Sequence, residues 1–275
     1  MYLGIDVGGT KTIVAVLDDS GVISQSQRFP TPQDYQLFLS KLAEVVDTFT
    51  TKDFRAVGVG IPATSIDRKT GIAVSFSNLA WHREPVQADI ERLIGSPAAV
   101  ENDAKLAGLS EAMLREPTRL LYLTISTGIG YSLVVDRIID QNIGDSGGRL
   151  LLFEHAGKLT PWERYASGKA IVETFGSEAK DIQDPEIWDK IARNITQGLI
   201  ELIAVTEPQV VVIGGSVGVY LDRFIEPLNK YLKELETPLL QVPPVEAAKR
   251  PEDAVIYGCY DYAKEVFTSP KWLTN

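Results

Sequence analysis

The sequence predicts an α/β protein with two domains, built from a duplicated unit and with a cleft between its halves. A chain of 275 residues has about the length of two domains. Short apolar runs alternate with stretches of helical periodicity, which is typical of α/β folds. Residues 3–8 (LGIDVG) and residues 123–128 (LTISTG) each combine an apolar strand with a glycine turn, and this correspondence indicates the duplication.

The first half, residues 1–115, opens with a strand, a glycine turn and a second strand. Its other elements follow from apolar runs between turn residues and from apolar residues at helical spacing. We expect strands at residues 2–7, 12–17, 22–29, 54–60 and 98–100, and helices near residues 37–49, 84–94 and 102–114. The periodic pattern breaks at residues 115–117 (REP), where we place the domain boundary.

The second half, residues 116–250, repeats this order of elements. We expect strands at residues 120–126, 131–135 and 210–213, a long helix over residues 187–203, and a helix that runs from the last strand to about residue 236. The long helix carries its apolar residues on one stripe, which is typical of an amphipathic helix.

Composition limits the kinds of partner and the compartment. The net charge of −10 and the pI of about 4.8 argue against a broad nucleic-acid-binding surface. The one cysteine, Cys259, excludes an intrachain disulfide and a zinc site made of several cysteines. No apolar run reaches the roughly 18 residues that span a bilayer, and residues 1–6 lack the basic start of a secretory signal. We therefore expect a cytoplasmic protein that binds neither nucleic acid nor membrane.

Three glycine turns are candidates for binding phosphate. Their residues are Gly8, Gly9, Thr10 and Lys11 in the first turn, Thr127 and Gly128 in the second, and Gly214, Gly215 and Ser216 in the third. Glycine lets backbone amides approach an anion, and neighbouring Thr, Ser and Lys side chains add hydrogen bonds. The first turn leads into a strand and so differs from the Walker A loop and from the dinucleotide fingerprint. Ordinary β-hairpins are the alternative for the first two turns.

Two acidic positions stand next to these turns and the predicted helices. Asp6 ends the first strand and is either a carboxylate near a phosphate-bound Mg²⁺, which it contacts through water, or a residue that caps its own turn. Asn102 and Asp103 precede a helical pattern, so either of them can be an N-cap. In the functional alternative, Asp103 accepts the proton of an attacking hydroxyl and Asn102 orients the same substrate.

A third polar group surrounds one of the two histidines. His155 follows Glu154 directly, and Glu163 lies a few residues further along. Neutral histidine and carboxylates together suit the recognition of vicinal hydroxyls, which offer both donors and acceptors. A surface histidine is the alternative, and His82 is expected in a surface loop.

Taken in order, these motifs resemble the ROK family (repressors, open reading frames, kinases) of sugar kinases. The motifs are GIDVGGTK at residues 4–11, ENDA at 101–104, TISTGIG at 124–130 and ASGKA at 166–170, with support from GIP at 60–62, SNLAW at 77–81 and VVIGG at 211–215. The resemblance covers residues 3–258. It implies an actin-like ATPase fold of the ribonuclease-H type and the phosphorylation of a hexose hydroxyl by ATP with Mg²⁺, most typically of glucose to glucose 6-phosphate.

The resemblance also implies roles for single residues. It assigns Asp103 as the catalytic base, Asn78 and Asn102 as sugar ligands, and Glu163 as a glutamate that contacts the sugar or supports the residues that do. It assigns the first two glycine turns to phosphate and the turn at residues 214–216 to the adenosine side. The last helix, about residues 251–268, is expected to pack on the first domain, and a homodimer is one oligomeric state that the resemblance allows.

The chain departs from the family pattern between residues 144 and 162. Many members carry Glu-x-Gly-His there, followed by cysteines that bind structural zinc, and these cysteines are missing. We therefore expect no zinc and take Glu154 and His155 as the replacements for the sugar-binding Glu and His. This region leaves the identity of the hexose open.

Three alternatives to an ATP-dependent glucose kinase differ in kind. A repressor is disfavoured, because the first hairpin begins at residue 3 and we expect no DNA-binding domain ahead of it. An inactive sugar sensor would bind sugar without releasing ADP. A kinase of the same fold would use polyphosphate as the donor, or fructose, mannose or an N-acetylhexosamine as the acceptor.

Overall fold

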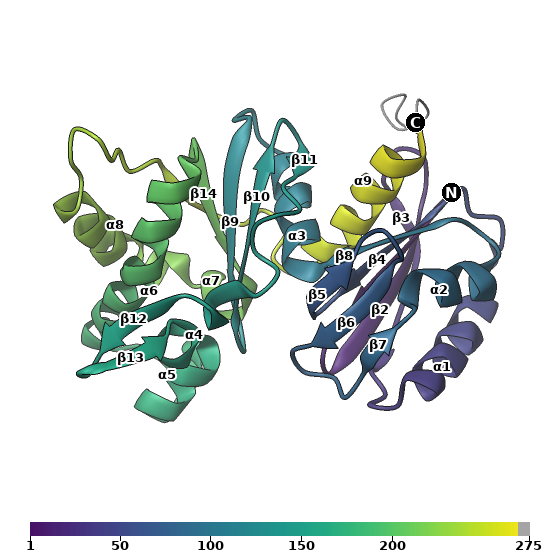
Figure 1. The fold of residues 1–275 in the computed structure, drawn as a ribbon, viewed down its shortest axis with the longest axis horizontal. Coiled ribbons are helices and arrows are strands. Elements are labelled where there is room, and N and C mark those ends of the chain that lie inside the picture. The colour runs from purple at the N-terminus through teal and green to yellow at the C-terminus, as the bar shows by residue number, and fades with distance from the viewer. Residues whose placement is uncertain (269–275) are drawn as a thin grey trace. The chain divides into compact units, whose positions relative to one another are not determined.

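A computed structural model describes residues 1–268, which form two compact units (Figure 1). Of the described residues, unit 1 comprises 1–110 and 253–268, and unit 2 comprises Glu111–Glu252. The chain leaves unit 1 inside α3 (Asp103–Ala112) and returns to it just ahead of α9 (Ala254–Thr268). The division therefore falls inside a helix, ahead of the 115–117 stretch at which the periodic pattern breaks.

The centre of unit 1 is a five-stranded sheet with the order β3-β2-β1-β4-β8. Its strands are β1 (Tyr2–Val7), β2 (Lys11–Leu17), β3 (Ile23–Pro30), β4 (Val57–Ile61) and β8 (Ala98–Asn102). The pairs β1–β2 and β2–β3 are antiparallel, whereas β1–β4 and β4–β8 are parallel. The carboxyl ends of β1, β4 and β8 therefore lie at the same edge of the sheet, and Asp6 and Asn102 lie there.

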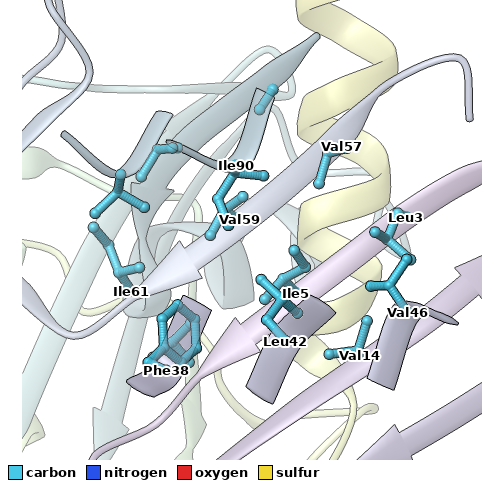
Figure 2. Packing of buried hydrophobic residues seen from close by; sticks show 14 of the residues in the cluster. Leu3, Ile5, Val14, Phe38, Leu42, Val46, Val57, Val59, Ile61 and Ile90 are labelled. Atoms are coloured by element: carbon cyan, nitrogen blue, oxygen red, sulfur yellow. The ribbon is translucent and has the colours of Figure 1, made fainter. Parts of the chain in front are cut away.

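The two faces of this sheet are covered by different helices. Alternate residues of β1 and β4, among them Leu3, Ile5 and Val59, pack against α1 (Tyr35–Asp47) and α2 (Val86–Ile94) (Figure 2). The opposite face packs on α9, which lies behind the strands in the same view. A Cβ on Gly58 of β4 would lie 2.0 Å from the backbone oxygen of Cys259, so only glycine permits this close approach of α9 to the sheet.

Unit 1 also contains a small antiparallel sheet that the sequence did not predict. It has the order β5-β6-β7 and consists of β5 (Ala63–Asp67), β6 (Ile72–Phe76) and β7 (His82–Glu84). These strands are short and only partly buried, so they lack the long apolar runs by which the other strands were recognised. The small sheet matters for the site, because Asn78 follows β6 and the end of β8 is bonded to β5.

Unit 2 repeats the sheet of unit 1. Its strand order is β11-β10-β9-β14-β15, with β9 and β10 antiparallel and both β9–β14 and β14–β15 parallel. The strands are β9 (Arg119–Ile125), β10 (Ile129–Val135), β11 (Ile138–Ile139), β14 (Val210–Gly214) and β15 (Val245–Ala247). The same order and the same directions in both units confirm the duplication that the two glycine turns predicted.

Helices and a hairpin complete unit 2. The helical elements are η1 (Gly147–Arg149), α4 (Glu163–Ala166), α5 (Gly168–Phe175), η2 (Ala179–Asp181), α6 (Pro185–Thr206), α7 (Gly215–Gly218), η3 (Leu221–Arg223) and α8 (Ile225–Glu234). The hairpin is formed by β12 (Leu152–His155) and β13 (Lys158–Pro161). The long helix α6 buries its apolar stripe in the core of this unit, as its periodicity predicted.

One predicted element of unit 2 was wrong. We expected a single helix from the turn at Gly214 to about residue 236, but the structure has α7, η3 and α8 in that interval. The Pro at position 227 falls in the first turn of α8, where proline is tolerated because the first backbone N–H groups of a helix have no partner inside it. None of the helices in residues 1–268 is long and apolar enough to cross a membrane.

Candidate active site

The first glycine turn, Gly8–Lys11, joins β1 to β2 and leaves two backbone amides unpaired. The amide of Gly8 donates to the Lys11 oxygen at 2.9 Å and closes the turn. Thr31, which follows β3 directly, braces the turn, because its hydroxyl donates to the Gly8 oxygen at 2.8 Å and its amide donates to the Thr10 oxygen at 3.1 Å. Among residues 1–268, nothing accepts a hydrogen bond from the amide of Gly9 or of Thr10. Two adjacent free N–H groups on a braced turn can bind a phosphate oxygen.

Asn78 lies directly against this turn. A Cβ on Gly9 would lie 2.6 Å from the Cβ of Asn78, so the glycine makes room for the asparagine. The preceding residue, Ser77, is held by a hydrogen bond from its amide to the Pro62 oxygen at 3.0 Å. The structure thus brings together Asn78 and the first turn, two groups that the sequence predicted separately.

Asp6 and Asp103 form a pair of partly buried carboxylates beside the same turn. Burial, then the charge of Asp103, then that of Asp253 raise the pKa of Asp6 to about 7, and Lys11 opposes them. Burial raises the pKa of Asp103 to about 6, and hydrogen bonds from backbone amides oppose the rise. One of those amides is that of Ala104, which donates to Asp103 Oδ1 at 2.7 Å. Asp103 is therefore a carboxylate whose proton affinity suits a general base near neutral pH.

Asn102 begins helix α3 as its cap. Its Oδ1 accepts a hydrogen bond from the Lys105 amide at 3.2 Å, and its Nδ2 donates to the Ala63 oxygen at 2.9 Å. The sequence left open which of Asn102 and Asp103 caps the helix. In the structure Asn102 is the cap, and Asp103 is the first residue of α3. One N–H of the Asn102 amide remains for a ligand.

A buried ion pair next to Asn102, between Glu101 and Arg68, could not be predicted from the sequence. The Glu101 carboxylate is fully buried and accepts hydrogen bonds from Arg68 Nε at 2.8 Å and from Arg68 Nη2 at 2.6 Å. The available signal in the sequence was Glu101, a charged residue near the end of a buried strand. A buried carboxylate requires a partner. The partner could not be identified, because it lies in the turn between β5 and β6, two strands that the sequence did not predict.

The second glycine turn, Ser126–Gly128, joins β9 to β10 and is arranged like the first. The Ser126 amide donates to the Gly128 oxygen at 2.9 Å, and the Gly168 amide donates to the Ser126 oxygen at 2.7 Å. The amides of Thr127 and Gly128 have no partner within the described chain. Each unit therefore presents a turn with two adjacent free N–H groups.

Glu163 supports the second turn from α4. Its Oε2 accepts a hydrogen bond from the Ile129 amide at 2.9 Å, and a Cβ on Gly128 would lie 2.4 Å from the same oxygen. Its Oε1 accepts a hydrogen bond from Arg149 Nε at 3.1 Å. Arg149, which the sequence reasoning also missed, lies in the stretch that departs from the family pattern.

The third turn, Gly214–Ser216, links β14 to α7 and is bonded to the second turn. The Ser216 amide donates to Ser126 Oγ at 3.1 Å. Gly215 has a φ of +83°, and a Cβ there would lie 2.6 Å from the Ile125 oxygen, so glycine is needed on both grounds. The second and third of the predicted glycine turns, which both lie in unit 2, are thus bonded to each other.

Glu154 and His155, predicted as a joint pair of sugar ligands, lie on opposite faces of the β12–β13 hairpin. They are consecutive residues of β12, and consecutive side chains of a strand project in opposite directions. The His155 ring stacks on Tyr165 with 4.1 Å between ring centroids, whereas Glu154 is exposed beside Leu159 of the paired strand. The structure therefore does not support a paired role for these two side chains.

The acidic groups of unit 1 fit a magnesium ion that is held largely by water and phosphate. Within residues 1–268, no three His, Cys, Asp or Glu side chains are arranged to hold a metal ion among themselves. Mg²⁺ in phosphoryl-transfer sites typically takes one or two carboxylates, with waters and phosphate oxygens as its other ligands. Asp6, whose pKa is raised by burial and by neighbouring carboxylates, is a suitable carboxylate for such an ion.

Comparison with known proteins places this geometry in a family. A family model described as the ROK family matches residues 2–266. The glucokinase of Streptomyces coelicolor is 24% identical, with 96% of this chain and 98% of the relative covered. The N-acetyl-D-glucosamine kinase of Haemophilus influenzae is 27% identical, with 94% and 97% covered.

A solved structure has the same fold. The crystal structure of a ROK family glucokinase from Streptomyces griseus in complex with glucose and AMPPNP matches with a TM-score of 0.80 and 22% identity, and it covers 96% of this chain and 99% of that chain. At this identity the match establishes the fold, which is the actin-like ATPase fold that the motifs predicted.

Proposed function

Because this chain belongs to the ROK family and is a hexose kinase of that family, we propose that it transfers the γ-phosphate of ATP to a hydroxyl of glucose, forming glucose 6-phosphate. The observation that carries the proposal is the position of Asp103. It lies at the start of α3 next to Asp6, the penultimate residue of β1, which leads into the first glycine turn. A carboxylate near a candidate phosphate site supports the proposal that Asp103 is the base.

The acceptor side of the proposal rests on unit 1. Asp103 accepts the proton of the attacking hydroxyl, which makes that oxygen a better nucleophile. Asn78, which touches the first turn, and the remaining N–H of Asn102 orient the sugar. The raised pKa of Asp103, about 6, leaves the carboxylate ionised at neutral pH and still able to hold a proton in the transition state.

The donor side rests on the glycine turns. Within unit 1 the free amides of Gly9 and Thr10 are donors for phosphate oxygens. Within unit 2 the free amides of Thr127 and Gly128 are such donors, and the turn at Gly214–Ser216 receives the adenosine. Such fixed donors stabilise the charge that develops on the transferred group. Asp6 would hold Mg²⁺ through water, and the ion, when bound, neutralises phosphate charge. Glu163 supports the second turn rather than binding the sugar with a free carboxylate.

The test is ADP formation from ATP and Mg²⁺ with glucose, mannose, fructose, N-acetylglucosamine and N-acetylmannosamine as acceptors. The panel includes N-acetylhexosamines because a relative of nearly full coverage is named for one of them. We expect turnover with at least one hexose, and we expect Asp103→Asn to lower kcat by about 10²-fold or more. Asp47→Asn, which changes an exposed carboxylate on α1, is the matched control.

Two results would contradict the proposal. A folded Asp103→Asn variant with normal kcat would exclude Asp103 as the base. Binding of a hexose without ADP release would indicate a sugar sensor, provided that polyphosphate also fails as the donor.

A further inference from the structure

Residues Glu101–Asp103, where β8 passes into α3, are called the Glu101–Asp103 corner. Hydrogen bonds at both ends of strand β5 hold this corner in place. At the first residue of β5, the Ala63 oxygen accepts a hydrogen bond from Asn102 Nδ2 at 2.9 Å. Just beyond its last residue, Arg68 pairs with Glu101. The strand therefore spans the corner, with one contact to each of the two residues that precede Asp103.

Arg68 extends from a turn that is itself well fixed. The turn follows β5, and its Asp67 accepts hydrogen bonds from the Lys69 amide at 3.0 Å and from the Gly71 amide at 2.8 Å. At the other end of the turn, the amide of Gln87 in α2 donates to the Gly71 oxygen at 3.3 Å. Because the turn is bonded within itself and to a helix, the Arg68 side chain starts from a rigid support.

The ion pair with Glu101 uses the fork of the guanidinium. Arg68 Nε and Nη2 bond the two different oxygens of the carboxylate, at 2.8 and 2.6 Å. This two-point contact fixes the plane of the carboxylate as well as its charge. The Glu101 side chain is 0% exposed and that of Arg68 is 21% exposed, so water competes little for the pair.

Because Glu101 is held by Arg68, it also fixes the backbone at the start of α3. Its Oε1, which is bonded to Arg68 Nη2, also accepts a hydrogen bond from the Asn102 amide at 2.8 Å. Asn102 in turn caps the helix through the Lys105 amide, and Asp103 is the first residue of that helix. A continuous chain of hydrogen bonds thus leads from Arg68 to the backbone that carries Asp103.

We propose that Arg68 is a positioning residue for the phosphoryl transfer, which sets the place of the Asp103 carboxylate through Glu101. The proposal rests on the proposed function, in which Asp103 is the base. In this proposal Arg68 acts through Glu101 and not by contact with the acceptor or the donor. Its effect is therefore expected on the rate of the chemical step and not on the binding of either substrate.

The kinetic test compares Arg68→Met with Arg68→Lys. Methionine keeps much of the side-chain length but leaves Glu101 without its partner, and we expect kcat to fall about 10- to 100-fold, because small displacements of a reacting group have effects of this size. The KM values for sugar and for ATP should stay within about twofold. Lysine keeps the charge but lacks the fork, so Arg68→Lys should recover part of kcat.

Two further variants make the result interpretable. Arg92→Met removes an arginine of the same unit that pairs with Asp89 at 2.8 Å, and kcat should be unchanged. Glu101→Gln keeps the volume and the acceptor for the Asn102 amide, and it replaces Arg68→Met if that variant does not fold. Unchanged kcat in folded Arg68→Met, or a loss of kcat that is matched by equal rises in both KM values, would overturn the proposal.

A crystal structure of Arg68→Met separates this proposal from the proposed function. We expect the Asp103 carboxylate to be displaced from its wild-type position, whether or not any hexose is phosphorylated. An unchanged Asp103 would overturn the positioning role while leaving the kinase function intact. Failure of the wild-type protein to phosphorylate any hexose would overturn the function while leaving the displacement testable.

Discussion

Arg149 Nε donates a hydrogen bond to Glu163 Oε1 at 3.1 Å, while the other oxygen of Glu163 accepts one from the Ile129 amide directly after the second glycine turn. The carboxylate therefore has a partner on each oxygen. Its charge is compensated by a guanidinium whose two Nη atoms have no partner in residues 1–268. A negative charge next to this turn would otherwise oppose the phosphate binding that we propose for it.

The first prediction concerns this charge balance. Arg149→Met leaves the Glu163 carboxylate uncompensated beside Thr127 and Gly128, so we expect the KM for ATP to rise about 3- to 10-fold. The double variant Arg149→Met, Glu163→Gln removes both charges and should show a smaller rise than Arg149→Met alone. Steady-state kinetics with ATP varied at saturating sugar measure both values.

Arg164→Met is the control for the Arg149 variants, since Arg164 is the exposed neighbour of Glu163 on α4. It should leave both KM values unchanged. A rise in the sugar KM of Arg149→Met at an unchanged ATP KM would contradict the prediction and would assign Arg149 to the acceptor.

The second prediction concerns Asp6 and the pH dependence of stability. The pKa of Asp6 in the folded protein is about 7, above the ordinary value of 3.8 for an aspartate, so the folded state binds the carboxyl proton of Asp6 more tightly than the unfolded state does. Its contribution to stability is full below about pH 3.8 and is lost as the pH rises through about 7. Asp6→Asn should therefore stabilise the ligand-free protein by about 1–3 kcal/mol at pH 8, and by much less near pH 4.

Urea unfolding of the wild type and of Asp6→Asn at pH 4, 6 and 8 measures this difference. Asp47→Asn, an exposed carboxylate with a side-chain exposure of 84%, should show no such trend. Equal stability of Asp6→Asn and the wild type at pH 8 would show that Asp6 is not destabilised by its surroundings.

The parts of the site that the sequence could predict are those with a local signal. The glycine turns, Asp6 and Asp103 lie at ends of strands and at the start of a helix, and both strands and helix follow from apolar patterns. The repeated turn also predicted the repeated sheet. These features depend on residues that are neighbours along the chain.

The parts that could not be predicted depend on distant residues or on the faces of unpredicted strands. Arg68 and Glu101 are 33 positions apart, and their pairing requires the small sheet β5-β6-β7, whose strands lack long apolar runs. Glu154 and His155 looked like a pair because they are adjacent, but β12 separates adjacent side chains onto two faces. The support that Glu163 gives to the second turn likewise joins residues 34 positions apart.

The third prediction concerns the contact between the sheet of unit 1 and α9. In Gly58→Ala the added Cβ would lie 2.0 Å from the Cys259 oxygen, a backbone atom that cannot move without shifting α9. We expect a loss of more than about 2 kcal/mol in the free energy of unfolding, by analogy with overpacked cores. Gly95→Ala has nothing within 4 Å of its Cβ but keeps a φ of +74°, so it should cost only about 1 kcal/mol. Equal losses in the two variants would contradict the close packing of α9.

The last prediction separates Glu154 from His155. Glu154 is exposed beside Leu159, so Glu154→Ala should change the sugar KM less than about twofold and the free energy of unfolding by less than about 0.5 kcal/mol. The His155 ring stacks on Tyr165 with an interplanar angle of 6°, and Tyr165 belongs to α4, which begins with Glu163. His155→Ala should therefore lower the free energy of unfolding by about 0.5–1.5 kcal/mol. Sugar kinetics and urea unfolding of both variants test this division, and a large rise in the sugar KM of Glu154→Ala would restore Glu154 as a ligand, because no loss of stability could account for it.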